Sequence, residues 1–590
     1  MDETSLQNIL NAPPTHPALK AALADFRRAL VSVMVFSAVV NLLMLAGPLY
    51  MLQVYDRVLA SHSVPTLLAL SAMLVMAYAF QGALDFIRSR ITGRAALAVD
   101  HHLDTTVHDA VVALGLRSQR AGDAQQPLRD LDQIRGFLTS SGVTAILDLP
   151  WAPVFLALCF AIHVWLGIVA LAGGGILFAL ALLSERASRE PTRAMTRQAG
   201  RRAALIEADR RNSETIVAMD MAEALAARWS RSNAEYLDGL SRAADVVGSF
   251  GTLSRAMRLT LQSAMLGVGA YLVIRQELSA GAMIAASIMM GRALAPIETV
   301  IANWRGCTAA RDSFHRLSGT LSRLGDTDAS TDLPAPCASL EAKHLGLAPF
   351  GAKSPIVRDV SFRLSAGEAL GVIGPSGAGK SSLVRGLAGI WPPVTGDVLL
   401  DGAPLRQWSR ASLAGRIGFL GQSVELFDGT VASNIARMAL DIDSAAVLAA
   451  AKAAGAHDMI LGLPGGYDTP IGDGGANLSA GQRQRLALAR ALYGDPFLIV
   501  LDEPNSNLDA EGDAALQAAM EGAKARGAIV VMIAHRPSAL AACDKVLVLA
   551  NGTQQAFGPR DEVVRAFTTR ARPVPAGAPV RAVRGKNALP

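Results

Sequence analysis

The stretch "EALGVIGPSGAGKSSLVRGLAGI", residues 368–390, decides the fold of the second half of the chain. An apolar run that favours a β-strand comes first, a glycine-rich loop follows it, and a periodic stretch that favours a helix comes last. Residues 374–381 match the pattern G-x-x-x-x-G-K-[ST] between that strand and that helix, which is the context that a phosphate-binding P-loop requires. The glycines let the backbone approach phosphate oxygens closely and turn its N–H groups toward them.

The side chains of this loop have separate expected roles. Lys380 reaches the outer phosphates and takes part in catalysis, and the Ser381 hydroxyl ligates Mg²⁺. The expected nucleotide-binding set is Gly374, Pro375, Ser376, Gly377, Ala378, Gly379, Lys380, Ser381 and Ser382.

A second motif, "PFLIVLDEP", covers residues 496–504. Its apolar run at 497–501 predicts a buried strand that ends at an acidic pair. Asp502 at the strand end is placed to hold the Mg²⁺ shell. Glu503 points to the other side of the strand end, where a carboxylate can polarise an attacking water as general base.

A third motif lies in "NLSAGQRQRLALARAL", residues 477–492, where L-S-x-G-Q precedes a strongly periodic helix. Ser479, the backbone at Gly481 and Gln482 would present donors to a γ-phosphate at that helix N-terminus. At this point the chain resembles the nucleotide-binding domain of ABC transporters, whose signature is L-S-G-G-Q. The resemblance makes ATP the expected nucleotide.

The resemblance extends to further loops in the order that the family has them. Gln422 in "IGFLGQSVELFDGT" resembles the Q-loop glutamine, which touches Mg²⁺, and His535 in "VVMIAHRP" resembles the switch histidine, which contacts the γ-phosphate. Asp509 closes "SNLD", which resembles the D-loop that joins the two sites of a dimer. Residues 469–475, "TPIGDGG", resemble the X-loop of exporters. The resemblance implies that ATP lies between the P-loop of one copy and the L-S-x-G-Q segment of another, and therefore a homodimer.

Two positions depart from the family pattern. Ala480 replaces the first glycine of the signature, where the family tolerates small residues. The family usually stacks an aromatic residue on adenine, but the corresponding stretch here is "LGLAPFGAKSP", residues 345–355, without tyrosine. Either Phe350 or prolines and aliphatic side chains cover the base, and the alternative role of Phe350 is to anchor its loop.

The first half of the chain has the pattern of a membrane protein. The sequence is 51% hydrophobic but only 5% aromatic, and its mean hydropathy of +0.31 indicates that part of it is solvated by lipid. A helix that crosses a bilayer needs about 20 apolar residues. Six spans are predicted, at 29–51, 66–86, 145–162, 166–183, 259–273 and 280–301, and the last two have the weakest apolar pattern.

Arginines mark the expected cytoplasmic side, because basic residues gather in cytoplasmic loops. They flank the first, second, fourth and sixth spans at Arg27, Arg28, Arg88, Arg90, Arg94, Arg186, Arg189, Arg193, Arg197, Arg201, Arg202, Arg305 and Arg311. Both termini and two long connections, 87–144 and 184–250, are therefore expected in the cytoplasm, with the connections as helical extensions of the spans.

Composition argues against a nucleic-acid-binding protein, a cysteine-based metal or disulfide framework, and a signal peptide. The net charge is only +5, and although the pI is near 9.1, the basic residues mostly flank apolar segments, so no nucleic-acid partner is expected. The four cysteines are scattered without a C-x-x-C pair, which predicts neither a metal site nor a disulfide framework. Residues 1–25 lack the pattern of a signal peptide.

Composition also divides the chain. The polar, proline-containing stretch "GDTDASTDLPAPCAS" follows the membrane segments, and alternating strand-like and helix-like runs follow it as in an α/β domain. The predicted parts are a short N-terminal cytoplasmic segment (1–25), a six-span α-helical transmembrane domain with cytoplasmic extensions (26–320), a linker (321–337), an α/β P-loop ABC ATPase domain (338–567) and a basic disordered tail (568–590). The resemblance to ABC transporters implies that these parts form the type I ABC exporter fold.

Three segments of the membrane half indicate which branch of the ABC transporter family the chain resembles. Residues 45–70 ("LAGPLYMLQVYDRVLASHSVPTLLAL"), 146–158 ("ILDLPWAPVFLAL") and 291–317 resemble type I secretion ATPases of the protease-exporter branch. About 28 residues precede the first span, so the peptidase-like domain of the haemolysin-exporter branch is expected to be absent. The resemblance implies a bacterial inner-membrane protein that works with a periplasmic membrane-fusion adaptor and an outer-membrane channel. It would move an unfolded polypeptide with a C-terminal signal out of the cytoplasm.

Two alternatives remain open at the level of the sequence. One is an exporter of lipid, peptide or small molecules with the same architecture, against which the 50–57 and 148–153 segments argue. The other is an ATP-gated channel or scaffold without turnover, against which Glu503 and His535 argue, since sites that do not hydrolyse ATP commonly lose one of them.

Charged residues in the membrane half lead to two further expectations. Asp148 is expected to cap the third span, with Pro150 and Pro153 in its first turn and Trp151 at the membrane interface. Intramembrane charges normally face a partner or a wet cavity. The hypothesis is that Arg255, Arg258, Arg292 and Glu298 line the polypeptide conduit; the alternative is that their helices start or end earlier and leave these charges in the cytoplasm.

Overall fold

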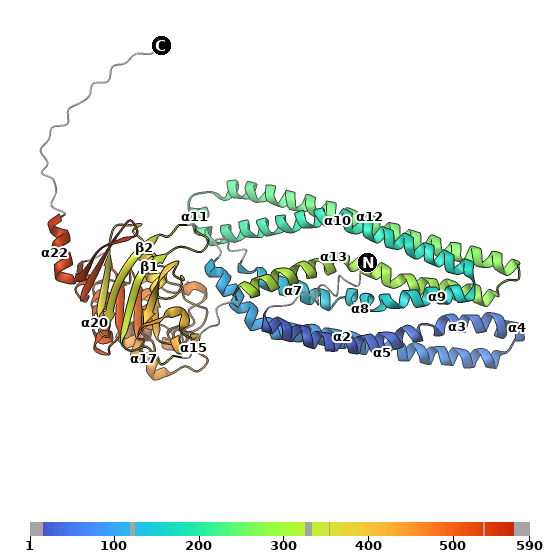
Figure 1. Ribbon diagram of the computed structural model, residues 1–590, viewed down its shortest axis with the longest axis horizontal. Coiled ribbons are helices and arrows are strands. Elements are labelled where there is room, and N and C mark those ends of the chain that lie inside the picture. The colour runs from blue at the N-terminus through green and yellow to red at the C-terminus, as the bar shows by residue number, and fades with distance from the viewer. Residues whose placement is uncertain (1–15, 118–123, 325–332, 353, 535–536, 571–590) are drawn as a thin grey trace, which may run out of the picture. The chain divides into compact units, whose positions relative to one another are not determined.

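The computed structural model describes residues 16–117, 124–324, 333–352, 354–534 and 537–570 (Figure 1). The chain divides into two compact units, Met1–Asp326 and Thr327–Pro590. The first unit is helical, and the second is built on a β-sheet with helices packed around it.

Six helical segments of the first unit are long and apolar enough to cross a membrane, which confirms the predicted number within the described residues. They are Pro17–Ser61, Val64–Arg117, Ser141–Ile162, Val164–Arg211, Ala222–Ile274 and Ala280–Leu324. Five of them run far beyond the predicted apolar spans because polar extensions continue the same helices, as expected for the long connections. The fifth and sixth segments are continuous helices through all four charges of the conduit hypothesis.

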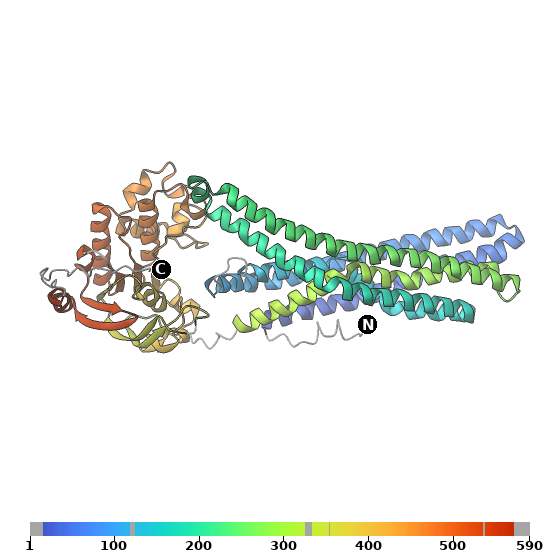
Figure 2. The same ribbon diagram turned by 90° about the horizontal axis from the view of Figure 1, so that it is seen from above.

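The helices of the first unit form two pairs with a middle group between them (Figures 1 and 2). One pair is α2 with α5, and the other is α10 with α12. The middle group is α7, α8, α9 and α13. The elements are α2 (Pro17–Leu43), α3 (Ala46–Gln53), the π-helix η1 (Val54–Val58), α4 (Leu59–Ser61), α5 (Val64–Arg117), α7 (Gln126–Leu138), α8 (Ser141–Asp148), the 3₁₀ turn η2 (Leu149–Trp151), α9 (Ala152–Ile162), α10 (Val164–Arg211), α11 (Ser213–Ala218), α12 (Ala222–Ile274) and α13 (Ala280–Leu324).

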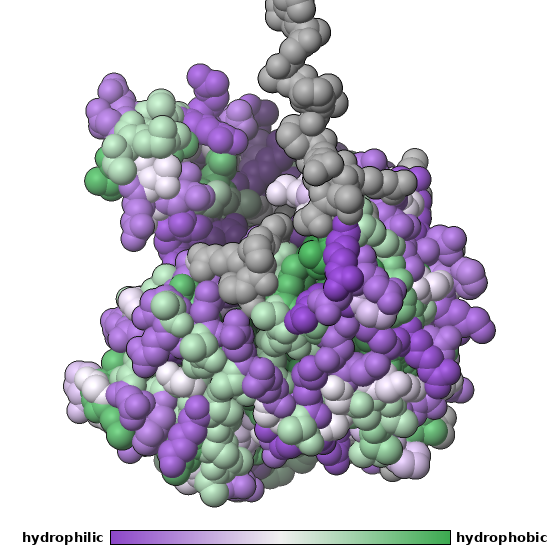
Figure 3. Space-filling model, turned by 90° about the vertical axis from the view of Figure 1, so that its left-hand side faces the viewer, coloured by the Kyte–Doolittle hydropathy of each residue, from purple (hydrophilic) through white to green (hydrophobic). Residues whose placement is uncertain are grey.

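The surface of the first unit is apolar along its spans. Large hydrophobic side chains are exposed on α2 and α5, among them Val31, Met34, Val35, Leu68, Met76 and Phe80. Half of the most apolar window of α13 is buried, against 6% of that of α5, so α13 is the enclosed helix and α5 a peripheral one. By contrast, the face of the second unit that Figure 3 turns toward the viewer is mainly hydrophilic, with small scattered apolar areas. A bilayer explains the first pattern, and water explains the second.

The start of the third span differs from its prediction. Ser140, not Asp148, caps this segment: its Oγ accepts the Gly142 N–H at 3.2 Å, and α8 then continues to Asp148. Asp148 makes no cap hydrogen bond. Pro150 does lie in the first turn of η2 and Pro153 in that of α9, as expected, because an N–H group at this position has no carbonyl partner within its helix.

The second unit contains a ten-stranded sheet in the order β5-β4-β1-β2-β10-β9-β3-β8-β7-β6. Strands β9, β3, β8, β7 and β6 are parallel, and β5, β4, β1 and β2 are antiparallel. The strands are β1 (Ser339–Leu347), β2 (Val357–Ser365), β3 (Ala369–Ile373), β4 (Thr395–Leu400), β5 (Ala403–Pro404), β6 (Ile417–Leu420), β7 (Leu498–Asp502), β8 (Ile529–Ile533), β9 (Lys545–Ala550) and β10 (Thr553–Pro559).

Helices enclose the parallel strands, which explains why β7 and β8 are buried throughout and apolar except for Asp502 at the end of β7. The helices are α14 (Lys380–Leu387), α15 (Arg410–Leu413), α16 (Val431–Ile435), α17 (Ser444–Ala453), α18 (His457–Leu461), α19 (Ala480–Leu492), α20 (Ala510–Ala525), α21 (Pro537–Leu540) and α22 (Arg560–Arg570). The carboxyl ends of β3, β8, β7 and β6 share one edge of the sheet, and the loops that follow them build the site.

Candidate functional site

The P-loop joins β3 to α14 in a conformation that only glycine tolerates well. Gly374 has φ +154°, and a Cβ on it would lie 2.0 Å from the Leu549 carbonyl oxygen. Gly379 has φ +94° and precedes the first residue of α14. A larger residue at either position would displace the loop, so the loop stays wrapped around the helix N-terminus, where free backbone N–H groups favour an anion.

Lys380 lies folded into this loop. Its Nζ donates hydrogen bonds to the carbonyl oxygens of Gly374 at 2.8 Å and Pro375 at 3.0 Å, and the residue is only 6% exposed. These two uncharged carbonyl groups hold the Lys380 ammonium group beside the N–H groups of α14. The loop therefore presents a positive charge and a helix N-terminus together, which suits the phosphates of a nucleotide.

The two expected Mg²⁺ ligands are in contact. Ser381 Oγ donates to Asp502 Oδ1 at 3.2 Å, although 121 residues separate them in the chain. Asp502 is 2% exposed, and this burial raises the pKa of its carboxyl group; the Ser381 hydrogen bond opposes that shift, and the negative charge of Glu503 adds to it. A hydroxyl and a buried carboxylate are the hard oxygen donors that Mg²⁺ prefers, so the residues fit this ion.

No group of three or more His, Cys, Asp or Glu side chains suited to a metal occurs within the described ranges.

Glu503 directly follows Asp502 and is partly buried. Its backbone has φ +53°, a left-handed conformation that is uncommon for a residue with a side chain. The Glu503 carbonyl accepts the Ser506 N–H at 3.3 Å, which starts the turn into the D-loop. Strained backbone of this kind clusters at functional sites, and here it occurs at the predicted general base.

The L-S-x-G-Q motif forms the N-terminus of α19. Ser479 is the N-cap: its Oγ accepts the Gln482 N–H at 3.2 Å, and Gln482 Oε1 accepts the Ser479 N–H at 2.9 Å. The Ser479 hydroxyl therefore keeps its own proton available for a phosphate oxygen. A Cβ on Gly481 would lie 3.2 Å from the Asn507 carbonyl oxygen, so this end of the helix packs closely on the D-loop.

Asp509 ends the D-loop and begins α20. Its Oδ1 accepts the Gly512 N–H at 2.9 Å and the Arg485 Nη2–H at 2.8 Å. The Gly512 hydrogen bond, followed by that of Arg485, lowers the pKa of the Asp509 carboxyl group. Because Arg485 belongs to α19, this ion pair holds the D-loop against the signature helix.

Three predicted residues remain: Gln422, His535 and Phe350. Gln422 is exposed just past β6, and β6 pairs in parallel with β7, so Gln422 lies at the edge that carries Asp502. His535 lies outside the described residues; the preceding strand, β8, places Ile533 opposite Asp502. Phe350 is partly buried in the turn between β1 and β2, and its contact with adenine stays a prediction.

The P-loop and the signature motif are not joined. Among the residues that the structure describes, no hydrogen bond or ion pair links residues 374–382 to residues 478–482. In one copy of the chain the P-loop therefore bonds the acidic strand end through Ser381 and Asp502, whereas the L-S-x-G-Q segment is bonded to neither within the described residues.

Sequence reasoning missed Gln484, which connects the signature helix α19 to the segment that follows Asp502. This residue is 3% exposed and bonds the backbone of the segment after Asp502. A signal was present: Gln484, Ala487, Leu488 and Ala491 share one helix face, so a polar residue interrupts an otherwise apolar stripe.

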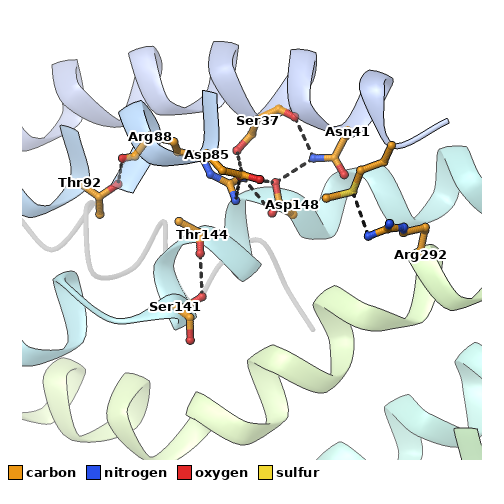
Figure 4. Close-up of polar contacts among 10 residues, drawn as sticks. Ser37, Asn41, Asp85, Arg88, Thr92, Ser141, Thr144, Asp148 and Arg292 are labelled. Atoms are coloured by element: carbon orange, nitrogen blue, oxygen red, sulfur yellow. Dashed lines mark hydrogen bonds and ion pairs between the residues drawn. The ribbon is translucent and has the colours of Figure 1, made fainter. Parts of the chain in front are cut away.

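The first unit contains a second polar cluster, between α2, α5 and α8 (Figure 4). Arg88 Nη1 lies 3.0 Å from each carboxylate oxygen of Asp148 and 2.9 Å from Ser37 Oγ. Asn41 Nδ2 donates to Asp148 at 2.9 Å, and Arg88 Nη2 lies 3.0 Å from Asp85. Arg88, which the sequence marks only as a cytoplasmic flank, therefore lies within a network that joins three helices.

The charges of the conduit hypothesis have different surroundings. Arg258 Nε on α12 pairs with Glu298 Oε1 on α13 at 2.9 Å. Arg292 Nη1 lies 4.0 Å from the Met44 sulfur, and Arg292 has no carboxylate partner among the described residues (Figure 4).

Comparison with known proteins identifies both units. Residues 357–506 match the family model described as ABC transporter, and residues 30–294 match the model described as ABC transporter transmembrane region. The chain is 50% identical over 544 residues to the type I secretion system ATP-binding protein PrsD of Rhizobium meliloti, with 92% of this chain and 94% of the relative covered.

A more distant relative and a solved structure agree. The chain is 31% identical to the cyclolysin secretion/processing ATP-binding protein CyaB of Bordetella pertussis, over 93% of this chain and 78% of the relative. The structure of a bacterial Atm1-family ABC exporter with ATP bound has a TM-score of 0.79 with 23% identity, covering 93% of this chain and 99% of that one. The latter likeness shows the fold alone.

Proposed function

The chain belongs to the ABC transporter family, and we propose that it is the ATP-hydrolysing exporter of a type I secretion system in the inner membrane of a bacterium. The proposed cargo is an unfolded polypeptide with a C-terminal signal. The proposal joins the ATPase geometry of the second unit to the role for which PrsD is named, and the chain matches PrsD over nearly its whole length.

The contact between Ser381 and Asp502 carries the ATPase part of the proposal. It puts the phosphate-binding loop and the acidic strand end into one site, with Glu503 next in the chain. Lys380 binds the outer phosphates, and Glu503 accepts a proton from the water that attacks the γ-phosphorus, so that ADP and phosphate are the products. Mg²⁺, held by Ser381, Asp502 and Gln422, would neutralise charge on the phosphate oxygens.

The site is complete only with a second copy. Ser479 keeps a free hydroxyl proton at a helix N-terminus, but within the described part of the chain it makes no contact with the P-loop. A homodimer would place Ser479 and Gly481 of one copy against the ATP held by the other. Closure on ATP and reopening after hydrolysis would then drive the membrane helices.

The partners follow from the same relatives. Proteins named for type I secretion and for cyclolysin secretion match more than 90% of this chain. We therefore place it with a periplasmic membrane-fusion adaptor and an outer-membrane channel. The arginine-flanked spans orient the second unit toward the cytoplasm.

Glu503→Gln tests the catalytic assignment. The amide cannot accept the proton, so kcat should fall by about 10²–10⁴-fold while ATP still binds. Phosphate release and nucleotide binding by the purified full-length protein measure the two effects. Glu521→Gln, the same change on an exposed face of α20, is the control and should leave both unchanged. Basal hydrolysis that survives Glu503→Gln would show that another group is the base.

A further inference from the structure

Gln484 is a buried polar residue on the inward face of α19, the helix that begins at the signature motif. It is 3% exposed, and its neighbours on that face, Ala487, Leu488 and Ala491, are buried apolar residues. A buried amide is tolerated only when its hydrogen-bonding groups have partners. Those partners therefore indicate what the residue does.

Both ends of the Gln484 amide bond one short segment of chain. Nε2 donates to the carbonyl oxygens of Glu503, at 3.3 Å, and Pro504. Oε1 accepts the Asn507 N–H at 3.2 Å and the Ser506 hydroxyl at 3.4 Å. One side chain thus holds four groups of residues 503–507, which connect the predicted base to the D-loop.

Residues 503–507 include a backbone conformation that other contacts must stabilise. Glu503 has φ +53°, a conformation that persists only when surrounding contacts enforce it. A small rotation of this backbone would swing the carboxylate away from the end of β7. The Gln484 amide restrains the carbonyl group of Glu503 itself, which is the closest restraint available to a side chain of another helix.

We propose that Gln484 is a positioning residue for ATP hydrolysis, which fixes the backbone of Glu503 and the start of the D-loop against the signature helix. The proposal rests on the ATPase function proposed above and adds a residue to it. Gln484 does not touch nucleotide; it acts through the orientation of Glu503.

The proposal also links two ATP sites of a dimer. Ser479 at the start of α19 would serve the ATP that the second copy holds, whereas Glu503 serves the ATP of its own copy. Gln484 belongs to the same helix as the signature segment and bonds the Glu503 carbonyl. Its amide therefore couples a movement of the signature segment to a movement of the base.

The test uses the full-length homodimer in lipid nanodiscs and three variants. Gln484→Met keeps the length of the side chain but removes all four hydrogen bonds. Gln484→Glu keeps the shape, but its ionised form cannot donate to the two carbonyl groups. Gln555→Met is the matched control, because Gln555 is exposed and its side chain donates to the hydroxyl of a neighbouring residue, Thr553.

Gln484→Met should lower kcat at least tenfold and change KM for ATP less than twofold, since the P-loop is untouched. Gln484→Glu should regain activity relative to the unchanged protein as pH falls from 8 to 6, because a protonated carboxyl can again donate to one carbonyl group. Gln555→Met should match the unchanged protein in both constants.

Two results would overturn the proposal: a kcat of Gln484→Met within twofold of the unchanged protein, or a Gln484→Glu activity ratio that does not vary with pH. If Gln484→Met fails to fold, the pH ratio of Gln484→Glu decides alone. Loss of activity in Glu503→Gln with normal Gln484→Met would reject only this inference. Activity that survives Glu503→Gln would instead reject the assigned base.

Discussion

At the scale of single residues, Asp502 has a carboxylate that the fold buries at some energetic cost. It is 2% exposed at the end of β7, and its partners are the Ser381 hydroxyl and two more distant cations, Arg385 and Lys380. Burial disfavours the ionised form and raises the pKa of the carboxyl group. Such a group suits a metal ion, because the ion replaces the lost hydration.

The raised pKa leads to a prediction about stability and pH. A carboxyl group whose pKa is raised by folding favours the folded state when protonated, and this contribution is lost as pH rises through the folded pKa. Asp502→Asn keeps an acceptor for Ser381 and removes the charge. It should therefore raise the Tm of the nucleotide-free protein at pH 8 by about 2–4 °C and by less at pH 5.

Differential scanning fluorimetry of the solubilised protein across this pH range measures the effect on Tm. Asp513→Asn, on the first turn of α20, provides a matched change at a carboxylate away from the P-loop. A Tm gain that is equal at pH 5 and pH 8 would contradict the argument from burial.

At the scale of elements, an ion pair joins α5 to the end of α8. The Arg88 and Asp148 side chains are only 11% and 14% exposed, and Ser37 and Asn41 of α2 complete the network. A paired buried charge adds little net stability, but removing one partner leaves the other uncompensated. The network therefore fixes which faces of α2, α5 and α8 meet.

Asp148→Leu should destabilise the protein by about 3–5 kcal/mol, because the more exposed Asp85 is then the one carboxylate that pairs with Arg88 among the described residues. The double variant Arg88→Met/Asp148→Leu should recover most of that loss, since neither charge remains. Thermal unfolding in detergent compares the variants, with Arg94→Met on the exposed face of α5 as control. A double variant as unstable as Asp148→Leu alone would show that shape, not charge, matters at this contact.

At the scale of the whole molecule, transport requires a path through the helices of the first unit. Arg292 lies on α13, the most enclosed of the six segments, and has no carboxylate partner among the described residues. An intramembrane cation without such a partner normally faces water or a substrate. The Arg258–Glu298 ion pair joins α12 to α13, so these two charges partner each other. Arg292 is therefore the charge on which the conduit hypothesis is tested.

Arg292→Glu should abolish polypeptide secretion while basal ATP hydrolysis stays within about twofold of the unchanged protein. The readouts are the cargo in the medium of cells that carry the adaptor and the channel, and phosphate release by the purified protein. Arg323→Glu, at an exposed position near the end of the same helix, is the control. Normal secretion and assembly with Arg292→Glu would rule out a role in the conduit.

The fold class could be predicted from the sequence alone, and so could the local conformation of the segments proposed to bind nucleotide. The P-loop, the acidic pair after β7 and the cap of α19 are local patterns of backbone geometry and short spacing, so covalent neighbours suffice to predict them. The six apolar runs likewise depend only on composition and length. His535 stays a prediction from the same kind of pattern.

Only the tertiary structure decided which polar groups pair across the chain. Asp148 looked like a helix cap because two prolines follow it, but Arg88, 60 residues away, binds it instead. Gln484 looked like one of several polar residues on a helix until residues 503–507 closed on its amide. Spacing along a chain reports local conformation, whereas a side chain is solvated or paired according to segments that the fold alone brings into contact.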